Sequence, residues 1–358
     1  MLHAVETQPG FQYKNGAAFT WGQQYAYFDF TDKYTDGPGT TFQVQRAVFD
    51  QRLAEAAQQQ GAEIRFGDAV CAWQEHDDGV TLTVQPEQGA DYTLAADFVL
   101  DASGYGRVLP RLLNLETPSC LPPRQAVFTH IDDGIVGDDF DRNKILICTH
   151  PQYRDVWLWL IPFSNGRCSI GVVGSVERLG AVQEGDESHI LRGWASEIPM
   201  LNRILAEAKW DNGVPFRHLR NYSANVSTLH GRHFALLGNA AEFLDPVFSS
   251  GVTIALHSAR LAVNVLHRQW QGENIDWARD YADPLMVGVN AFRTYVEGWY
   301  DGSFQDVIYA DEHRVNADIR RKISAILAGY AWDESNPYVC KSQRRLAALS
   351  EVCGTVKS

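Results

Sequence analysis

The chain has 358 residues, of which 45% are hydrophobic and 21% are charged. This length and balance indicate a globular protein large enough to bury a core, and they exclude a chain dominated by disorder. The formal net charge of -13 comes without any block of lysines or arginines. The composition therefore argues against a nucleic-acid-binding protein, whose affinity depends on neutralising phosphates.

Six cysteines are scattered without a C-x-x-C pair, which predicts reduced thiols and no zinc site. The first residues show no basic segment followed by an apolar run, and no apolar stretch approaches the length that spans a bilayer. We therefore expect a cytoplasmic protein with no metal, no signal peptide and no transmembrane segment.

In chain order, the first predicted element is a helix over residues 42–60, rich in alanine and glutamine and ended by Gly61. Short strand-like runs follow at residues 63–66, 69–74, 80–84, 92–94 and 97–100. The turn residues His76-Asp-Asp-Gly79 predict that the second and third of these runs form a hairpin.

The middle of the chain is rich in predicted strands, at residues 125–130, 144–149, 155–161 and 167–174. The turn Asn165-Gly166 predicts that the last two pair as a hairpin. A short apolar strand at 234–237 and a helix at 250–266 come next. From Trp277 onward the pattern is mostly helical, with one apolar face made by Leu285, Val289, Phe292, Tyr295 and Val296.

The most informative stretch is Leu236-Leu-Gly-Asn-Ala-Ala-Glu-Phe-Leu-Asp-Pro-Val-Phe-Ser-Ser-Gly-Val-Thr-Ile-Ala255. A buried strand ends at Gly238, where backbone can approach a ligand closely, and a loop with Pro246 leads into a helix that starts at Ser-Ser-Gly. The free N–H groups and positive dipole end of that helix suit an anion or an electron-rich ring edge. A simple capped helix start is the alternative interpretation.

Two further motifs carry chemistry. In Trp157-Leu-Trp-Leu-Ile-Pro162, alternation places both tryptophans on one face of a strand. The pair could line a functional site, or the two side chains could simply pack in the core. The segment Phe11-Gln-Tyr-Lys-Asn-Gly-Ala-Ala-Phe19 holds Lys14. A lysine in a confined, partly dry tunnel can donate a hydrogen bond or act as a nucleophile, whereas a surface lysine before a turn is the alternative.

Together these motifs resemble those of the flavin-dependent, tryptophan halogenase-like family within the FAD-dependent monooxygenase superfamily. Residues 243–251 match its F-x-x-P-x-x-S-x-G pattern, and residues 157–162 match W-x-W-x-I-P. Lys14 lies in a similar Lys-x-Gly-Ala context. The resemblance implies that Ser250 and Gly251 bind halide and that Lys14 is the catalytic lysine that directs hypohalous acid. It also implies that a substrate tunnel passes the second motif, formed by Trp157, Trp159, Ile161 and Pro162.

The resemblance implies FAD as cofactor, reduced by a separate flavin reductase, with halide and O2 as co-substrates. The implied cofactor-binding residues are Arg46, Asp101, Gly104, Gly238, Asn239, Asp245, Pro246, Ser250 and Gly251. In the family the strand ends in Gly-Asp and the acid bonds the ribityl chain, whereas Asn239 offers an amide without charge. Arg46 and Asp50 also have the spacing of an ordinary helical ion pair.

The resemblance also implies an α/β fold of the FAD-dependent monooxygenase/halogenase type. We predict a partial FAD-binding domain at 1–118, a β-rich substrate-binding lobe at 119–230, the return of the FAD-binding domain at 231–270 and a helical C-terminal region at 271–358. The family's opening strand, G-x-G-x-x-G loop and helix are not found in this sequence. We therefore expect this first βαβ unit to be missing, a strand edge to be unpaired and FAD to bind this chain weakly or not at all.

The predicted function is halogenation of an electron-rich aromatic substrate of phenol or pyrrole type, free or bound to a carrier protein. Phe248 stands where the free-tryptophan branch has a glutamate, which favours this class. Two alternatives remain, a related FAD-dependent monooxygenase or oxidoreductase and a flavin-free, non-catalytic fragment. Turnover of substrate without halide would distinguish the monooxygenase or oxidoreductase from the halogenase.

Overall fold

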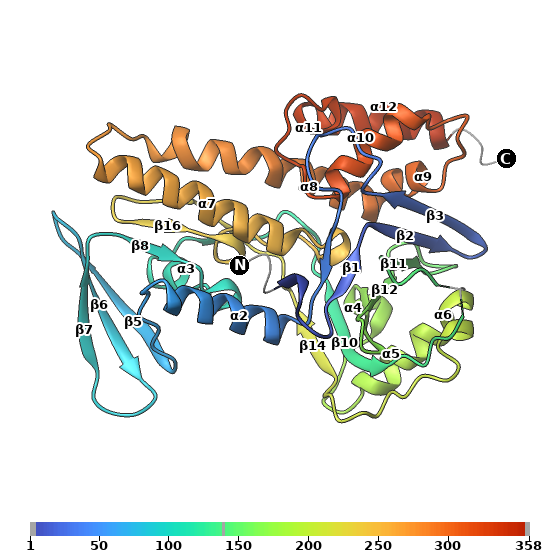
Figure 1. Cartoon of the computed structure of the whole chain (residues 1–358), viewed down its shortest axis with the longest axis horizontal. Coiled ribbons are helices and arrows are strands. Elements are labelled where there is room, and N and C mark those ends of the chain that lie inside the picture. Colours follow the sequence, from blue (N-terminus) through green and yellow to red (C-terminus); the bar gives the residue numbers. More distant parts are fainter. Residues whose placement is uncertain (1–4, 138–139, 355–358) are drawn as a thin grey trace. The chain divides into compact units, whose positions relative to one another are not determined.

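The structure is a computed structural model that describes residues 5–137 and 140–354, and the chain divides into two compact units (Figure 1). Unit 1 comprises Met1–Ala62, Pro123–Asn221 and Thr294–Ser358, and unit 2 comprises Glu63–Pro122 and Tyr222–Arg293. Each unit therefore assembles segments that lie far apart in the sequence.

A seven-stranded sheet forms the centre of unit 1. All neighbouring strands are antiparallel except β11 and β2, which run parallel. In spatial order the strands are β14 (Arg217–Arg220), β10 (Gln125–Asp132), β13 (Arg167–Gly174), β12 (Trp157–Pro162), β11 (Lys144–Thr149), β2 (Gly16–Trp21) and β3 (Gln24–Asp29).

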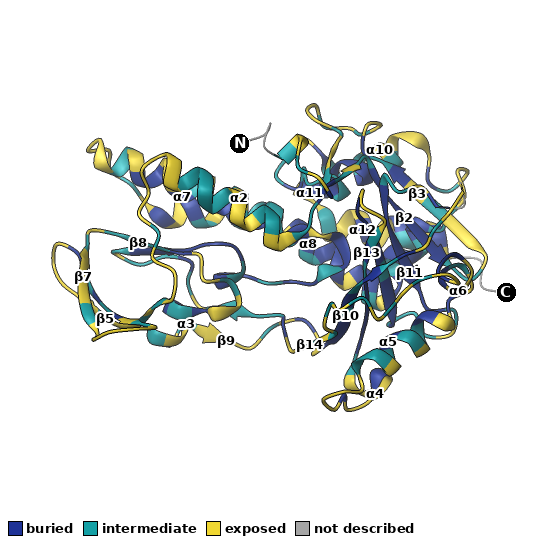
Figure 2. Cartoon of the chain, turned by 60° about the horizontal axis from the view of Figure 1, so that its bottom comes forward, coloured by how far each residue is buried: buried dark blue, intermediate teal, exposed yellow. Residues whose placement is uncertain are grey.

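Alternation along these strands produces a hydrophobic core on one face of the sheet. Leu146, Leu158, Ile170 and Val172 are fully buried there with residues of α5 (Glu187–Ser196) and α6 (Pro199–Ile204). In Figure 2 the strands β2, β11 and β13 are accordingly coloured mainly as buried. A short helix, α4 (Val176–Leu179), follows β13.

The remaining elements of unit 1 are a small sheet and the C-terminal helices. β1 (Gln12–Lys14) pairs with β4 (Thr41–Gln43), and α2 (Arg46–Gln59) follows. The C-terminal part contains the end of α8 (Asp283–Asp301), α9 (Ser303–Ile308), α10 (Ala317–Leu327), α11 (Pro337–Cys340) and α12 (Ser342–Gly354). The predicted apolar face of α8 is confirmed, since its five residues are all buried.

Unit 2 contains three small sheets and the long helix α7 (Ser250–Trp270). The antiparallel sheet has the order β5 (Asp68–Glu75), β6 (Val80–Pro86) and β7 (Tyr92–Ala96). β8 (Val99–Asp101) and β16 (Phe234–Leu236) form a parallel pair, and β9 (Glu116–Thr117) pairs with β15 (Asn225–Val226). A short α3 (Val108–Leu112) follows β8, and a π-helical turn (Ala278–Ala282) precedes α8.

The α/β fold class is confirmed, and so are the two predicted hairpins. β12 and β13 are antiparallel around Gly166, whose φ of 75° is the left-handed conformation that this turn requires. The β5–β6 hairpin is closed by a hydrogen bond of 2.8 Å from the His76 amide to the Gly79 carbonyl. The parallel pair β8–β16 has no third named strand in the described part of the chain, but residues 229–231 bridge the other edge of β16, with the Leu236 amide donating to the Leu229 carbonyl at 2.9 Å.

Two expectations were wrong. The first predicted helix starts at Arg46 and not at residue 42, because residues 41–43 pair with β1 as β4. Residues 63–66 form no strand, and the Phe66 side chain is 78% exposed. A strand exists only where a neighbour satisfies its backbone N–H and C=O groups, and no described strand lies beside this segment.

No helix in the described ranges combines the length and apolar character needed to cross a membrane.

The packing of Trp159 on Gly171 gives a test of this sheet. A Cβ atom at Gly171 would lie 2.3 Å from the Trp159 ring and 2.7 Å from Phe128 Cβ. Gly171→Ala is therefore expected to lower the free energy of unfolding by about 1–3 kcal/mol, as overpacking does. Gly193→Ala is the control, because this residue of α5 meets open space and alanine favours helix. Urea titrations that find both variants equally stable would contradict this packing.

Candidate functional site

The end of β16 and the helix α7 are packed at van der Waals distance in unit 2. Gly238 has a φ of 50°, and a Cβ atom there would lie 2.9 Å from Ala255 Cβ. The Gly238 amide also donates a hydrogen bond of 3.0 Å to Ser258 Oγ on α7. Only glycine fits both the conformation and the space, so this position fixes where the following loop leaves the strand.

The loop then turns into the start of α7. Asp245 is buried and accepts hydrogen bonds from the Val247 amide (3.0 Å) and the Tyr222 hydroxyl (3.2 Å). A 3-10 turn, Pro246–Phe248, follows, and Ser249 precedes the helix in the left-handed conformation with φ 53°. The predicted loop residues Asp245 and Pro246 therefore shape the backbone that leads into the helix.

The first turn of α7 has the features of an anion site. Its N-cap residue makes no side-chain capping bond, and the turn contains no acidic residue. Ser250 is buried, while the space above Gly251 is open, its nearest neighbours being Asn239 Oδ1 and Phe243, each 3.8 Å from where a Cβ would lie. The structure thus brings Asn239 and Gly251 together beside backbone N–H groups that have no helical partner.

The predicted residues after β8 lie beside this loop in the same unit. Both carboxylate oxygens of Asp101 accept backbone hydrogen bonds, from Ser103 (2.7 Å) and Leu109 (2.8 Å), so this side chain closes its own turn. The Asp101 carbonyl accepts the Leu237 amide at 2.8 Å, which joins the two strand ends. Gly104 has a φ of 60° and opens the 3-10 turn Gly104–Gly106.

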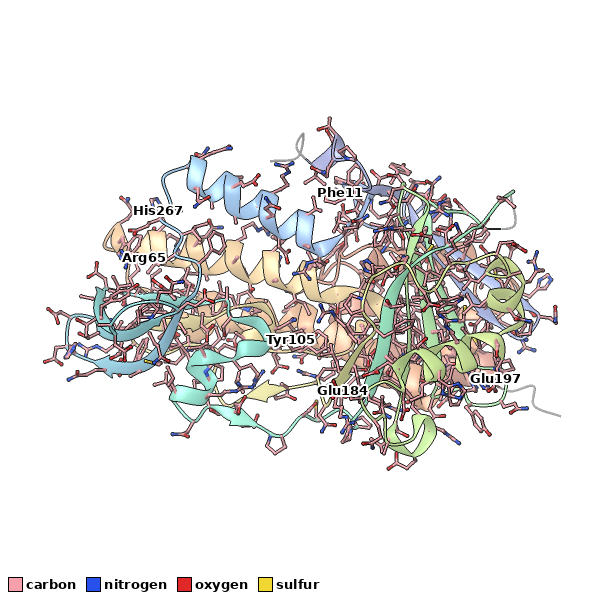
Figure 3. All side chains as sticks on the ribbon, turned by 90° about the horizontal axis from the view of Figure 1, so that it is seen from below. Phe11, Arg65, Tyr105, Glu184, Glu197 and His267 are labelled. Carbon is pink, nitrogen blue, oxygen red and sulfur yellow. The ribbon has the colours of Figure 1, made fainter. Side chains whose placement is uncertain are left out.

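Tyr105, labelled in Figure 3, lies in this 3-10 turn. Its ring centroid is 5.2 Å from that of Phe243, in an edge-on contact. The aromatic pair therefore adds a second link between the loop after β8 and the loop after β16.

Arg107 was missed by sequence reasoning and connects these two loops. It is buried although its φ of 46° is left-handed, a conformation that costs a residue with a Cβ roughly 1–2 kcal/mol. Its guanidinium donates to Glu116 (2.8 Å) and to the carbonyls of Asn225 (3.0 Å) and Asn239 (3.4 Å). These bonds offset the cost and tie the turn after β8 to the backbone of Asn239.

Glu242 is a second residue that the sequence did not reveal. Its buried carboxylate accepts hydrogen bonds from Asn225 Nδ2 (2.8 and 3.0 Å) and Arg293 Nη2 (2.9 Å). Desolvation raises the pKa of Glu242, and the charges of Arg293 and Arg107 offset this only in part. The carboxylate therefore holds the loop after Asn239 in place.

Lys14 lies in unit 1 at the end of β1, where it is partly buried. Its Nζ is 5.7 Å from the centre of the Phe30 ring, and no carboxylate in the described residues pairs with it. Desolvation lowers the pKa of Lys14 from 10.5 to about 8. A fraction of this amine is therefore neutral, and so nucleophilic, close to neutral pH.

The tryptophan motif lies on β12 in the same unit. Trp157 and Trp159 share a face, with ring centroids 5.8 Å apart, as predicted. Trp157 is 1% exposed and donates to the Tyr300 hydroxyl (3.0 Å), whereas Trp159 is only partly buried and donates to Ser169 Oγ (3.1 Å). Ile161 follows on the same face, and Pro162 ends the strand.

Arg46 opens α2 and forms the ion pair with Asp50 that its spacing predicts, at 2.9 Å. Its side chain is exposed. The predicted residues therefore fall into two groups, each within one unit. Unit 1 holds Lys14, Arg46 and the tryptophan motif, and unit 2 holds Asp101, Gly104, Gly238, Asn239, Asp245, Pro246, Ser250 and Gly251.

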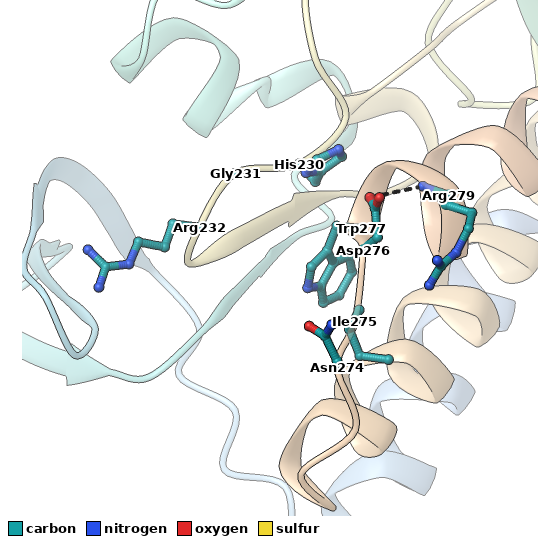
Figure 4. A pocket seen from close by; sticks show the side chains of 8 residues that line it. All are labelled: His230, Gly231, Arg232, Asn274, Ile275, Asp276, Trp277 and Arg279. Atoms are coloured by element: carbon teal, nitrogen blue, oxygen red, sulfur yellow. Dashed lines mark hydrogen bonds between the residues drawn. The ribbon is translucent and has the colours of Figure 1, made fainter.

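A surface hollow of about 640 Å³ lies elsewhere in unit 2 (Figure 4). His230, Arg232, Asn274, Asp276 and Trp277 are among the residues that line it. None of the residues predicted from the motifs lines this hollow, so it supports no part of the candidate site.

Comparison with known proteins identifies the family. The profile of the tryptophan halogenase family matches residues 28–334. The chain belongs to this family. It is 28% identical, over 87% of its length, to a 1H-pyrrole-2-carbonyl-[peptidyl-carrier protein] chlorinase of Pseudomonas fluorescens, and covers 69% of that protein. It is 27% identical to a flavin-dependent halogenase of Armillaria mellea, over 74% of this chain and 53% of that one.

Solved structures of flavoproteins have a similar fold. A flavoprotein/dehydrogenase from Cytophaga hutchinsonii is 35% identical, with a TM-score of 0.91 over 100% of this chain and 86% of that chain. A flavin-dependent brominase is 20% identical, with a TM-score of 0.78 over 96% of this chain and 82% of that one. The chain thus spans about half to seven-tenths of the length of the two curated halogenases described above. It spans more than four-fifths of the length of the two solved chains.

The lowered pKa of Lys14 predicts a pH-dependent stability. The folded-state pKa of about 8 lies below the ordinary value of 10.5, so between these values the unfolded chain binds more protons and stability rises with pH. Below pH 8 the full cost of burying the ammonium is present. Lys14→Met is expected to raise the urea midpoint at pH 7, with a gain that shrinks toward pH 10.5. Lys322→Met, which removes a helical ion pair with Asp318, is the control and should show no such trend. Loss of stability by Lys14→Met at pH 7 would contradict the desolvation.

Proposed function

We propose that the chain is the catalytic part of a flavin-dependent halogenase that acts on an electron-rich aromatic compound. The observation that carries this proposal is Lys14, a partly buried lysine without a carboxylate partner in the described residues and with a pKa lowered to about 8. A flavin monooxygenase needs no such amine. A halogenase does, because hypohalous acid is small and must be held close to the substrate.

FAD is the cofactor that fits the residues of unit 2. The open space above Gly251 and the side chain of Asn239 leave room and hydrogen-bonding groups for a flavin and its ribityl chain, on a loop that the Gly238 contact with α7 holds in place. Residues 1–358 contain no G-x-G-x-x-G loop for the pyrophosphate, so the fit concerns the flavin end of the cofactor. When bound and reduced by a separate flavin reductase, FAD supplies the reaction with O2 that oxidises halide to hypohalous acid.

Residues of this chain act before and after that flavin chemistry, first by binding halide and then by directing hypohalous acid. The unpaired N–H groups at Ser250 and Gly251 bind the halide anion, since this helix start carries no acidic residue that would repel it. The Lys14 amine donates a hydrogen bond to hypohalous acid or is halogenated by it, and so directs the halogen to the substrate. The partly buried indole of Trp159 keeps some flat apolar surface beside which an aromatic substrate can lie.

A phenol- or pyrrole-type substrate, free or bound to a carrier protein, is supported by two observations. Phe248, buried before the helix start, replaces the glutamate of the free-tryptophan branch. One relative is named as a chlorinase of a carrier-bound pyrrole. The partners proposed are accordingly a flavin reductase and an aromatic small molecule or its carrier protein.

A second candidate is a flavin-dependent dehydrogenase or monooxygenase that uses the same flavin contacts. It is favoured by the 35% identity with a protein named as a flavoprotein/dehydrogenase. Product formation with halide omitted separates the two candidates, since only the halogenase needs the anion.

The role of Lys14 is tested by its replacement. With a flavin reductase, saturating FAD, halide and O2, Lys14→Ala is expected to lower the halogenation rate by about 100-fold or more, the usual effect of removing a group that acts on the reacting atoms. Oxygen consumption should persist, because the lysine acts after the flavin chemistry. Lys14→Arg should rescue only in part, since guanidinium is bulkier and stays charged.

Lys33→Ala is the matched control, since Lys33 bonds the Gly37 carbonyl and lies over Tyr330. Product mass spectrometry beside an oxygen electrode reads both outputs. Halogenation by Lys14→Ala near the parent rate would rule out this role.

The halide site is tested at Gly251. A Cβ atom there would meet only ordinary contacts at 3.8 Å, so Gly251→Ala should fold normally while its methyl group fills the space above the helix start. The halide concentration for half-maximal rate is expected to rise about tenfold, the effect of weakening one hydrogen bond to a charged group. Gly193→Ala, in open space on another helix, is the control. An unchanged halide dependence would place the anion elsewhere.

A further inference from the structure

Two lysines of unit 1 flank the bend at Asn15 and have opposite surroundings. Lys14, on β1, has no carboxylate partner among the described residues. Lys144, at the start of β11, is buried and ion-paired with Asp141 at 2.6 Å. The ammonium charge of Lys144 is therefore balanced by a carboxylate, whereas that of Lys14 is not.

The turn at residues 141–144 contacts the strands around Lys14 at several points. Asn143 accepts a hydrogen bond from Gln12 through its side chain (3.0 Å) and from the Asn15 amide through its carbonyl (2.9 Å). The Arg142 carbonyl accepts Gln43 Nε2 at 2.9 Å. Because Gln12 belongs to β1 and Gln43 to β4, this turn braces both strands of the small sheet that carries Lys14.

Among the described residues, Lys144 is the one that joins this turn to the bend through its side chain. Its Nζ donates to Asn15 Oδ1 (3.1 Å) and to Asp141 Oδ2 (2.6 Å). Asp141 also accepts the Asn143 amide (2.9 Å). Burial works to raise the pKa of Asp141, but its bonds to Lys144 and Asn143 outweigh this and hold the pKa below its ordinary value. The ammonium is thus paired and pointed at Asn15.

The bend is held from its other side as well. The Asn15 carbonyl accepts the Phe30 amide at 2.7 Å, and the ring of Phe30 lies under the Lys14 ammonium. A Cβ at Gly16 would lie 2.3 Å from the Phe28 carbonyl oxygen and 3.1 Å from Lys144 Cε. The stem of Lys144 therefore packs directly on the backbone that follows Lys14.

We propose that Lys144 is a positioning residue for Lys14, which fixes the Asn15 bend so that the Lys14 amine stays half-buried over Phe30 and unpaired. The importance of this for catalysis rests on the proposed function of Lys14. Lys144 itself takes no part in the chemistry, because its ammonium is bound to Asp141 and Asn15.

The test is the pH profile with which acetic anhydride labels Lys14 in the purified chain, followed by peptide mass spectrometry. The parent should show a midpoint near the value of about 8 that desolvation gives Lys14. Lys144→Met keeps the length of the stem but removes the grip on Asn15. Lys14 then becomes hydrated, and its midpoint should rise by about one pH unit or more toward that of a free lysine.

Asn15→Ala gives an independent measurement, because it removes only the amide and keeps both backbone bonds of the bend. It should shift the midpoint in the same direction, and it decides the question if Lys144→Met does not fold. Lys322→Met, which breaks the ion pair with Asp318 on α10, should leave the profile unchanged.

Parent-like midpoints in the folded variants would overturn the inference, whatever the activity of the enzyme. Conversely, shifted midpoints together with normal halogenation by Lys14→Ala would leave the positioning intact and remove the proposed function of Lys14.

Discussion

The contact between Gly238 and α7 fixes how the loop after β16 reaches the start of this helix. With no Cβ at this position, the end of β16 meets the backbone of α7 near Ala255, and Ser258 anchors it there. The loop that follows then has only one course, past Asn239 and the buried Glu242 to the left-handed Ser249, where the helix begins. A side chain at residue 238 would separate strand from helix and move the loop that leads to the start of α7, where we propose the anion site.

The buried polar residues keep that course fixed. Arg107 accepts a left-handed backbone so that its guanidinium can reach the Asn239 carbonyl, and Glu242 is bound by Asn225 and Arg293. Buried charges of this kind are expensive unless every one of them is paired. Their role is therefore better understood as fixing one loop conformation than as adding stability.

Local signals in the sequence predicted the elements that depend on local chemistry. Gly166 and the alternating pattern around it predicted the β12–β13 hairpin, and the helix at Ser250 starts where its motif predicts. The β2–β3 hairpin was not predicted, although Gly22 carries the left-handed turn between its strands. Residues 63–66 have the composition of a strand, yet composition cannot supply a neighbour to pair with.

The residues of the candidate site also fall into those that local sequence predicts and those that depend on distant contacts. The residues of contiguous motifs, such as Gly238, Asn239 and Gly251, were predicted from the resemblance of their pattern to the family, and the structure places Asn239 beside Gly251. Arg107 and Glu242 were not, because each has a partner far away in the sequence, Asn225 at 118 residues from Arg107 and Arg293 at 51 residues from Glu242. The sequence distinguishes Lys14 by its motif, but it does not show that Lys144 donates to Asn15 beside it, because these two residues are 129 apart in the chain.

The parallel pair β8–β16 also constrains how the chain reaches its folded form. The whole segment Pro123–Asn221, which belongs to unit 1, lies between these strands in the sequence. Bringing their ends together while that segment is unfolded carries a large loop-closure entropy, whereas neighbouring antiparallel strands such as β12 and β13 close over a short turn. Loop-closure entropy therefore favours formation of the inserted sheet before the β8–β16 pair, and we expect the start of α7 to be completed late in folding.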